Sequence, residues 1–389
     1  MENVIIIIDW VLFIYFGINV SYFFVFSLAS LFPKPRKPQP AKSYKRFAIL
    51  IPAYSEDAVI RECVRSCIAQ QYPSEFFDTV VISDSMRSET NAALAKLPIR
   101  LIEVHFENST KSKSINAAME AIGTNYDIAV ILDADNVIPP NYLLDINDKF
   151  ALPGVEVVQT HRVAKNLNSN MALLDAISEE INNSIFRLGH ANMKMSAALI
   201  GSGMAFDYRL FRYVMSRVRA VGGFDRELEL RLLYGRKFIH YLPDTYVQDE
   251  KIQSQDGFSR QRRRWLSAQW FYFTAASPYF LKGLFTARWD FCDKYFQQIS
   301  APRLLLIGFV FINTVISSFI CPFASIKWWL LLVTITSALF IAIPRRYINR
   351  HLGTALLSLP HAFFIMVGNL FKLRHANKKF IHTEHGIET

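Results

Sequence analysis

The sequence predicts an α/β fold with an open, mostly parallel sheet that carries helices on both faces, joined to transmembrane and interfacial α-helices. Short apolar runs that end in polar residues alternate with helical patterns through the centre of the chain, as in parallel α/β sheets. Long apolar segments lie near both ends, as in a membrane protein with a soluble centre. A hydrophobic content of 51% excludes a disordered chain, and four cysteines in 389 residues exclude a disulfide scaffold.

The first apolar segment predicts a membrane-spanning helix within residues 1–33. No charged residue lies between Trp10 and Phe32, a length that exceeds the roughly 20 residues needed to cross a bilayer. The segment lacks a basic start and is too long for a cleaved signal peptide, so we expect a retained anchor. The proline-rich linker 34–46 has six basic residues and no acidic one. Because basic loops stay in the cytoplasm, we expect the central domain to be cytoplasmic. With the apolar segments near the other end of the chain, we expect a multi-pass protein of the inner cell membrane.

Four segments at the start of the central domain predict strands, and the first is a short continuous apolar run that is typical of a buried parallel strand. They cover residues 47–54, 78–84, 100–105 and 127–135. In open parallel sheets, ligands bind beyond the carboxyl ends of the strands. Asp84, Asp133 and Asp135 fall at these ends and are therefore candidate site residues.

Two groups of charged residues in this region suggest a site for a metal ion and a diphosphate. Asp133 and Asp135 leave a buried strand together, and two such carboxylates can hold Mg²⁺ or Mn²⁺. The alternative is that they cap the next helix. Lys111 and Lys113 precede a helical pattern, where their ammonium groups could neutralise a nucleotide diphosphate. A solvated basic loop explains the two lysines equally well.

Two later helical patterns carry further candidates. Asp225 and Glu227 start an amphipathic helix, where a carboxylate could take a proton from an acceptor hydroxyl or simply complement the helix dipole. Gln261, Arg264 and Trp265 lie in a basic and aromatic segment. Its cations could bind pyrophosphate and its indole could stack on a sugar. The alternative is a basic amphipathic helix on the membrane surface, continuing into interfacial helices over 266–302.

The apolar segments after the central domain predict a transmembrane hairpin and a third, different helix. Residues 304–321 and 328–343 form the hairpin within 303–345, and basic residues flank it on both sides. The segment 352–370 precedes several basic residues, so we expect an interfacial or re-entrant helix and a cytoplasmic tail within 346–389. An ordinary fourth span is the alternative. The net charge of +10 concentrates beside these segments, which favours membrane lipid over nucleic acid as its partner.

The order of these motifs resembles the membrane-embedded inverting glycosyltransferases of family 2, which include cellulose, chitin and hyaluronan synthases. The resemblance runs from Ile51-Pro-Ala-Tyr-Ser-Glu56 to Trp265 and implies a GT-A domain over 47–265. It implies a nucleotide-sugar donor, most readily a UDP-sugar, with Mg²⁺ or Mn²⁺ as cofactor. A tail motif around Thr383 is similar to the gating loop of cellulose synthases.

The resemblance also implies roles for individual residues. The base motif of the family keeps its last acid as Asp225, although Phe224 replaces the middle acid, and Glu227 is the reserve base. Asp135 is the metal ligand, Asp133 contacts both metal and nucleotide, and Trp265 contacts the acceptor. The remaining donor-binding positions are Ala53, Tyr54, Glu56, Asp84, Lys111, Lys113, Gly203, Gln261, Arg264 and Thr383.

The implied reaction is a single displacement that forms a β-linkage on the hydroxyl of a growing polysaccharide. Transfer of one sugar to a polyprenyl phosphate or another lipid is the alternative. So few spans would not enclose a polysaccharide, so a homo-oligomer or a secretion partner would complete a channel. A scaffold or cyclic-nucleotide receptor on a degenerate domain is a third possibility, and the retained aspartates argue against it.

Overall fold

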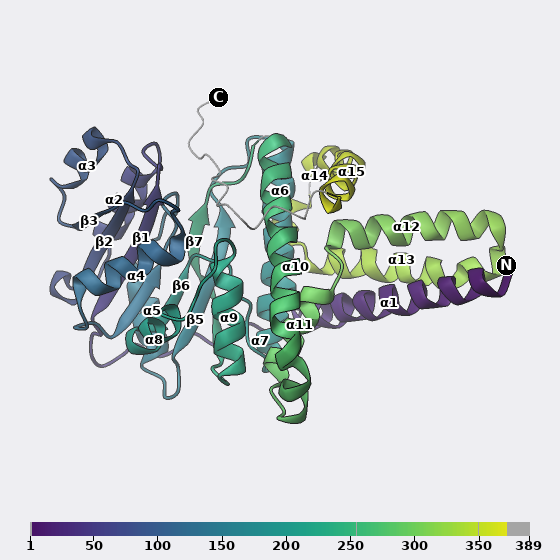
Figure 1. Ribbon diagram of the computed structural model, residues 1–389, viewed down its shortest axis with the longest axis horizontal. Coiled ribbons are helices and arrows are strands. Elements are labelled where there is room, and N and C mark those ends of the chain that lie inside the picture. Colours follow the sequence, from purple (N-terminus) through teal and green to yellow (C-terminus); the bar gives the residue numbers. More distant parts are fainter. Residues whose placement is uncertain (1, 254, 349, 372–389) are drawn as a thin grey trace.

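The computed structural model describes residues 2–253, 255–348 and 350–371. Three parts lie one after another along the longest axis of the molecule (Figure 1). An α/β domain lies at one end, a bundle of long helices lies at the other, and a group of helices stands between them across the bundle axis.

The α/β domain is built on a seven-stranded sheet with the order β3-β2-β1-β4-β6-β5-β7. β6 is antiparallel to both its neighbours, and the other pairs are parallel, so the predicted open, mostly parallel sheet is confirmed. The strands are β1 Phe47–Tyr54, β2 Phe77–Asp84, β3 Arg100–Val104, β4 Ile128–Ile131, β5 Val157–Ala164, β6 Met204–Asp207 and β7 Ile239–Asp249.

Helices cover both faces of this sheet because its central strands are apolar on both sides. In β1, Leu50 points to one buried cluster with Ile115 of α4, while Ile49 points to another with Ile60 of α2. Each such fully buried side chain contributes about 1.5–3 kcal/mol. The helices of this domain are α2 Ile60–Ile68, η1 Ser74–Phe76, α3 Ser88–Leu94, α4 Lys111–Ile122, α5 Tyr142–Phe150, α8 Tyr208–Met215 and α9 Phe224–Tyr234.

The helices between the domain and the bundle form a plate against which the first long helix docks (Figure 1). A Cβ on Gly189 would lie 2.3 Å from the Phe26 carbonyl oxygen, so only glycine permits this approach of α1. The plate consists of α6 Asn170–Asn182, the π-helix η2 Asn183–Gly189, α7 His190–Asn192, α10 Gln255–Phe285 and α11 Trp289–Ile299.

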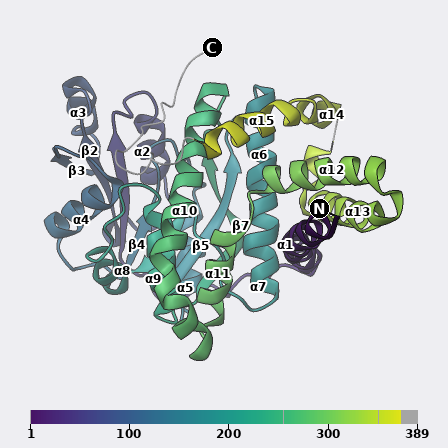
Figure 2. The same ribbon diagram turned by 45° about the vertical axis from the view of Figure 1, so that its right-hand side comes forward.

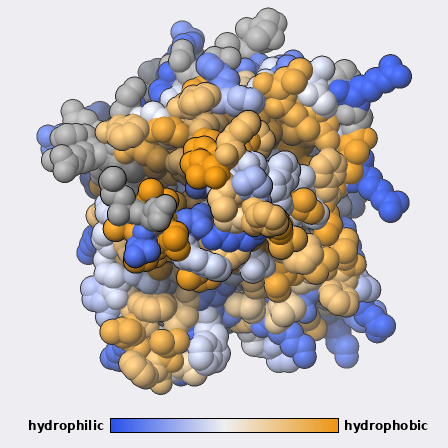
Figure 3. All heavy atoms as spheres, turned by 90° about the vertical axis from the view of Figure 1, so that its right-hand side faces the viewer, coloured by the Kyte–Doolittle hydropathy of each residue, from blue (hydrophilic) through white to orange (hydrophobic). Residues whose placement is uncertain are grey.

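The bundle consists of α1 Glu2–Ala29, α12 Arg303–Ile320 and α13 Pro322–Ala342. Each is long and apolar enough to cross a membrane, as is the segment Leu352–Leu370. Phe319 and Phe323 at the far end are 86% and 88% exposed, which is unfavourable in water. Seen along the bundle, apolar side chains cover most of the face (Figure 3). These features favour insertion into a bilayer.

The last apolar segment is broken into two short helices that lie across the bundle (Figure 2). α14 Arg350–Leu356 contacts α6, and α15 Leu359–Leu370 contacts α10 and α12. The short helix η3 Arg345–Tyr347 precedes them. This placement favours the interfacial expectation over a fourth span, although the segment's position relative to a bilayer stays a prediction.

Candidate active site

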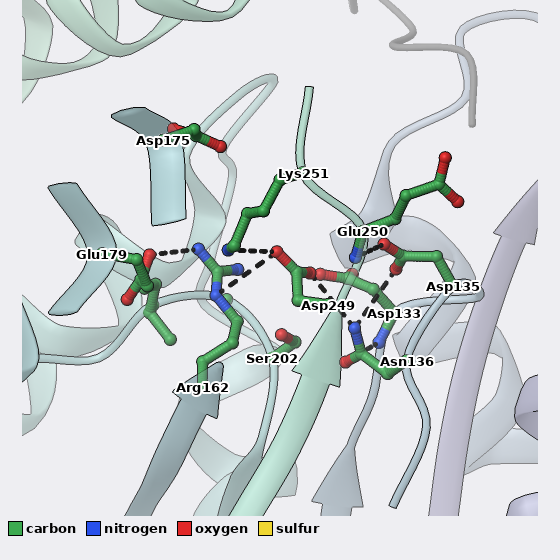
Figure 4. Close-up of polar contacts among 12 residues, drawn as sticks. Asp133, Asp135, Asn136, Arg162, Asp175, Glu179, Ser202, Asp249, Glu250 and Lys251 are labelled. Atoms are coloured by element: carbon green, nitrogen blue, oxygen red, sulfur yellow. Dashed lines mark hydrogen bonds and ion pairs between the residues drawn. The ribbon is translucent and has the colours of Figure 1, made fainter. Parts of the chain in front are cut away.

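Three carboxylates meet at one end of the sheet. Asp133 and Asp135 follow β4, Asp249 ends β7, and one oxygen of each lies within 4.8 Å of the others (Figure 4). The loop after β4 reaches β7 because Val137 and Gln248 exchange two backbone hydrogen bonds of 2.9 and 3.0 Å. The sequence pattern identified the first two acids and missed Asp249, although that residue also ends a strand.

One buried amide ties the three acids together. The side-chain oxygen of Asn136 accepts from the Asp133 backbone N–H at 2.9 Å. Its amide nitrogen donates to Asp135 and to Asp249, each at 3.2 Å. Asn136 is fully buried, so its orientation is fixed by these contacts. Three oxygen ligands held in this way suit a hard divalent cation such as Mg²⁺ or Mn²⁺.

Two lysines contact the acids. Lys111 forms an ion pair with Asp133 and donates to the Gly201 carbonyl at 2.7 Å. Lys251 donates to Asp249 at 2.8 Å. Burial lowers the pKa of Lys251, but the nearby Asp249 carboxylate outweighs this and leaves the pKa above its ordinary value. Lys113 instead donates to the Asn108 carbonyl on the exposed side of its helix, away from the acids.

Gly201 connects the acids to the expected base. A Cβ on this glycine would lie 3.7 Å from the Asp225 carboxyl carbon, and its carbonyl accepts from Lys111. Asp225 therefore lies next to Gly201, and Asp133 is linked to the same glycine through Lys111. Glu227 is turned elsewhere, since it pairs with Arg231 at 2.7 Å. The structure thus brings together Asp225 and the acid group but not Glu227.

Gly203 lies behind this loop rather than in the site. It has a φ of +60°, and a Cβ there would lie 2.6 Å from Val247 and 2.7 Å from the Thr160 hydroxyl. Its carbonyl accepts from Thr160 at 2.8 Å and from Gln159 at 3.0 Å. Gly203 therefore sets the shape of the loop that carries Gly201.

The ends of β1 and β2 form a second part of the site. Asp84 is 1% exposed, and its Oδ2 is buried with no hydrogen-bond partner in the described part of the chain. An unpaired buried acceptor is costly, so this atom indicates a ligand that donates a hydrogen bond. Tyr54 pairs with Asp84 in the sheet register. Ala53 is buried and Glu56 is half-buried nearby.

The motif on α10 reaches the acids through Arg264. Burial lowers the pKa of Arg264, and the nearby carboxylates of Asp133 and Asp225 partly offset this. The Gln261 side-chain oxygen is buried with no partner among the described residues. Trp265 is covered on one side, since the Arg262 guanidinium carbon lies 4.4 Å from its ring centre. Thr383 lies outside the described residues.

A buried charge network continues from the acids towards the helical plate (Figure 4). Arg162 lies 3.7 Å from Asp249 and donates to Glu179 at 2.8 Å. Glu179 also accepts from Arg187 at 3.1 Å. Burial raises the pKa of Glu179, but these arginines lower it further, to about 2. Glu179 is therefore ionised at neutral pH, and Arg162 links it to the acid group. Sequence patterns did not identify this network.

Comparison with known proteins adds to this geometry. Residues 45–268 match the family described as glycosyltransferase like family 2. The probable glycosyltransferase YdaM of Bacillus subtilis is 22% identical over 248 residues, covering 59% of this chain and 57% of that protein. The beta-monoglucosyldiacylglycerol synthase of Trichormus variabilis is 23% identical over 257 residues, covering 62% and 53%. The chain thus spans about half the length of the curated relatives it matches.

A solved structure has the same fold. The mannosyltransferase PcManGT of Pyrobaculum calidifontis, in complex with GDP-Man and Mn²⁺, aligns with a TM-score of 0.54 and 17% identity, covering 84% of this chain and 94% of that one. The sheet and its helices therefore form a GT-A-like domain, as expected. With more than half of its residues matched by the family, this chain belongs to glycosyltransferase like family 2 and is a glycosyltransferase.

Proposed function

We propose that this enzyme transfers a sugar from a nucleotide-sugar donor, most readily a UDP-sugar, to an acceptor hydroxyl with inversion at the anomeric carbon. The observation that carries the proposal is the convergence of Asp225 with the carboxylates of Asp133, Asp135 and Asp249 around Lys111 and Gly201.

The donor would lie along the strand ends. The nucleoside would sit beside Asp84, whose unpaired Oδ2 can accept a hydrogen bond from a base N–H or a ribose hydroxyl. β2 and β4 flank β1, so the two parts of the site lie two strand spacings apart, about 10 Å. The diphosphate would then lie near the three carboxylates. A divalent cation held by these acids would supply positive charge to the departing diphosphate.

The residues of the chain would supply the remaining functions. Lys111 and Arg264 would stabilise the diphosphate charge that develops in the transition state. The Asp225 carboxylate would take the proton of the acceptor hydroxyl. The hydroxyl oxygen would bond to the anomeric carbon as the bond to the diphosphate breaks, so an α-linked donor gives a β-linked product.

We propose a growing polysaccharide as the acceptor. The alternative is the transfer of one sugar to a lipid. The motif order supports the first, and a relative named beta-monoglucosyldiacylglycerol synthase supports the second. A bundle of three described helices is too small to enclose a polysaccharide, so a polymer would require a homo-oligomer or a secretion partner. Products of graded length would indicate a polymer, and one glycolipid would indicate the alternative.

The arrangement relative to the membrane is part of the proposal. α1, α12 and α13 would span the inner cell membrane, α10, α11 and α15 would lie at its surface, and the GT-A domain would face the cytoplasm. The exposed apolar surface of the bundle supports its insertion into a membrane (Figure 3). The basic linker 34–46 supports the cytoplasmic side for the domain.

The test uses the purified full-length chain with Mn²⁺ and a panel of nucleotide sugars, and follows nucleoside diphosphate release and product formation. We expect Asp225→Asn to lower transfer at least about 100-fold, the usual contribution of a general base, with UDP binding unchanged. Asp207→Asn is the matched control. It removes the carboxylate that caps the start of α8, and the asparagine amide can cap that helix equally well. Comparable turnover by Asp225→Asn and the wild type would contradict the assignment.

A further inference from the structure

One face of α6 carries a cluster of polar side chains that the proposed reaction does not use. Asp175, Ser178 and Glu179 follow the helical spacing of three and four residues, so they share this face. Arginines from two other elements contact it. Arg262 of α10 donates to Asp175 at 2.8 Å, and Arg303 of α12 donates to the Ser178 hydroxyl and carbonyl, each at 2.8 Å. The cluster therefore lies where the domain meets the bundle.

The cluster and its neighbours contain more positive than negative charge. The five cations are Arg162, Arg187, Lys251, Arg262 and Arg303, and the three acids are Asp175, Glu179 and Asp249. Most of these side chains are buried. Asp249 also faces Asp133 and Asp135, and Lys111 pairs with Asp133, so the wider count is six cations against five acids. One positive charge is left without a counter-charge, which is unfavourable when buried, so the cluster favours an anion.

Arg303 is the cation that lacks an acidic partner. The other four each have a carboxylate oxygen within 4.0 Å. Among the described residues Arg303 has none, and its Nη1 is buried with no hydrogen-bond partner. A guanidinium group with unused N–H donors matches the oxygens of a phosphate group.

The position of Arg303 points to a lipid as the source of that phosphate. Arg303 is the first residue of α12, an 18-residue apolar helix that can cross a membrane. Its side chain would therefore lie at the depth of the lipid phosphates. Beside it, Leu266 of α10, Leu305 of α12 and Phe363 of α15 form an apolar cluster. That cluster is buried, but Phe311 and Ile312 further along α12 are exposed. A cation at the end of an apolar helix with exposed side chains suits an amphiphile with a phosphate head.

We propose that Arg303, with Arg262 beside it, binds the phosphate group of a membrane lipid at the junction of α6, α10 and α12. The proposal goes beyond the sugar-transfer reaction and does not depend on it. The lipid phosphate would neutralise the charge excess on the membrane side of the network, while the donor diphosphate would lie on the other side of Arg162.

The test measures ligand binding to the full chain in dodecyl maltoside micelles, which contain no phosphate. Dodecyl phosphate, dodecanol and inorganic phosphate are titrated while the melting temperature and tryptophan fluorescence are followed, since Trp265 contacts Arg262. We expect dodecyl phosphate alone to bind at low concentration. Arg303→Gln should weaken that binding at least about tenfold, because a hydrogen bond to a charged group is lost.

Two further variants and one control make the result interpretable. Arg303→Lys keeps the charge but not the planar donor pair, so its affinity should fall between the wild type and Arg303→Gln. Ser178→Ala removes a contact that orients Arg303 and should also weaken binding. Arg345→Gln is the matched control, because Arg345 is an exposed arginine next to the other end of the hairpin, and it should bind as the wild type does.

Three outcomes would overturn the proposal. The first is unchanged dodecyl phosphate binding in Arg303→Gln and Arg303→Lys. The second is equally tight binding of inorganic phosphate, which would indicate a site for a free anion. The third is an equal loss of UDP affinity in the Arg303 variants, which would place Arg303 in the donor site. Nucleoside diphosphate release by the same samples separates these results from a failure of the proposed reaction.

Discussion

Two groups of charged residues lie on either side of Arg162, and they differ in sign. At the strand ends, Asp133, Asp135 and Asp249 bring three carboxylates together around one amide. Along α6, arginines outnumber the acids they contact. Arg162 contacts both groups, through Asp249 and Glu179. The difference suggests that each group is suited to a ligand of opposite charge, a cation in the first and a phosphate in the second.

Removing the link between the groups should have the largest effect on stability. Arg162→Met leaves Glu179 and Asp249 each with one cation fewer in a buried setting. Breaking a buried ion pair costs about 3–5 kcal/mol, so we expect a clear fall in the melting temperature in detergent.

Lys165→Met is the control for this change, because Lys165 pairs with the exposed Glu62. An exposed pair contributes about 0–1 kcal/mol, so the melting temperature should barely move. Equal melting temperatures for Arg162→Met and the wild type would mean that the two groups are not coupled through Arg162.

Lowering the pH should destabilise the fold through Glu179, by somewhat less than the substitution Arg162→Met does. The pKa of Glu179 is about 2 in the folded chain against 4.5 ordinarily. Because the folded value is lower, the ionised carboxylate stabilises the fold fully above about pH 4.5, and this contribution is lost as the pH falls towards about 2. The difference corresponds to about 3 kcal/mol. Melting temperatures across this range should fall for the wild type and fall less for Glu179→Gln, and equal slopes would contradict the role of Glu179.

The smallest expected effect is on the Mn²⁺ affinity of Asp133, Asp135 and Asp249. Asn136→Leu keeps the size of the side chain but removes its bonds to Asp135 and Asp249. Loss of such a supporting contact lowers metal affinity about 10- to 100-fold, which Mn²⁺ titration by electron paramagnetic resonance would measure. Asn141→Leu is the control, since Asn141 contacts Asp145 instead. Equal Mn²⁺ affinity in the wild type and Asn136→Leu would show that the carboxylates bind the ion without the hydrogen bonds from Asn136.

The sequence was sufficient to predict the parts of the fold that local patterns encode. The first and fourth strands are continuous apolar runs, and the second and third are shorter apolar stretches among polar residues. All four are present, with bounds shifted by a few residues. The paired acids Asp133 and Asp135 could be identified because they directly follow such a run. The expected bases could be separated only by tertiary contacts, since Asp225 meets Gly201 whereas Glu227 meets Arg231.

The residues that were missed depend on contacts between distant parts of the chain. Asp249 ends a strand whose sequence includes Pro243 and alternates buried with exposed residues, so it lacks the continuous apolar pattern. It joins the site through the bridge between Val137 and Gln248 and the hydrogen bond from Asn136, both of which connect distant parts of the chain. Likewise, only the packing of Val247 shows that Gly203 lies behind the loop.

The central claim is that three carboxylates from two strand ends hold one divalent cation. Its most direct test is calorimetric titration of Mn²⁺ into the full chain with UDP present. The control is Asp244→Asn, which removes an exposed carboxylate of the same strand. We predict that Asp249→Asn lowers Mn²⁺ affinity at least about tenfold while Asp244→Asn leaves it unchanged. Wild-type affinity in Asp249→Asn would contradict the claim.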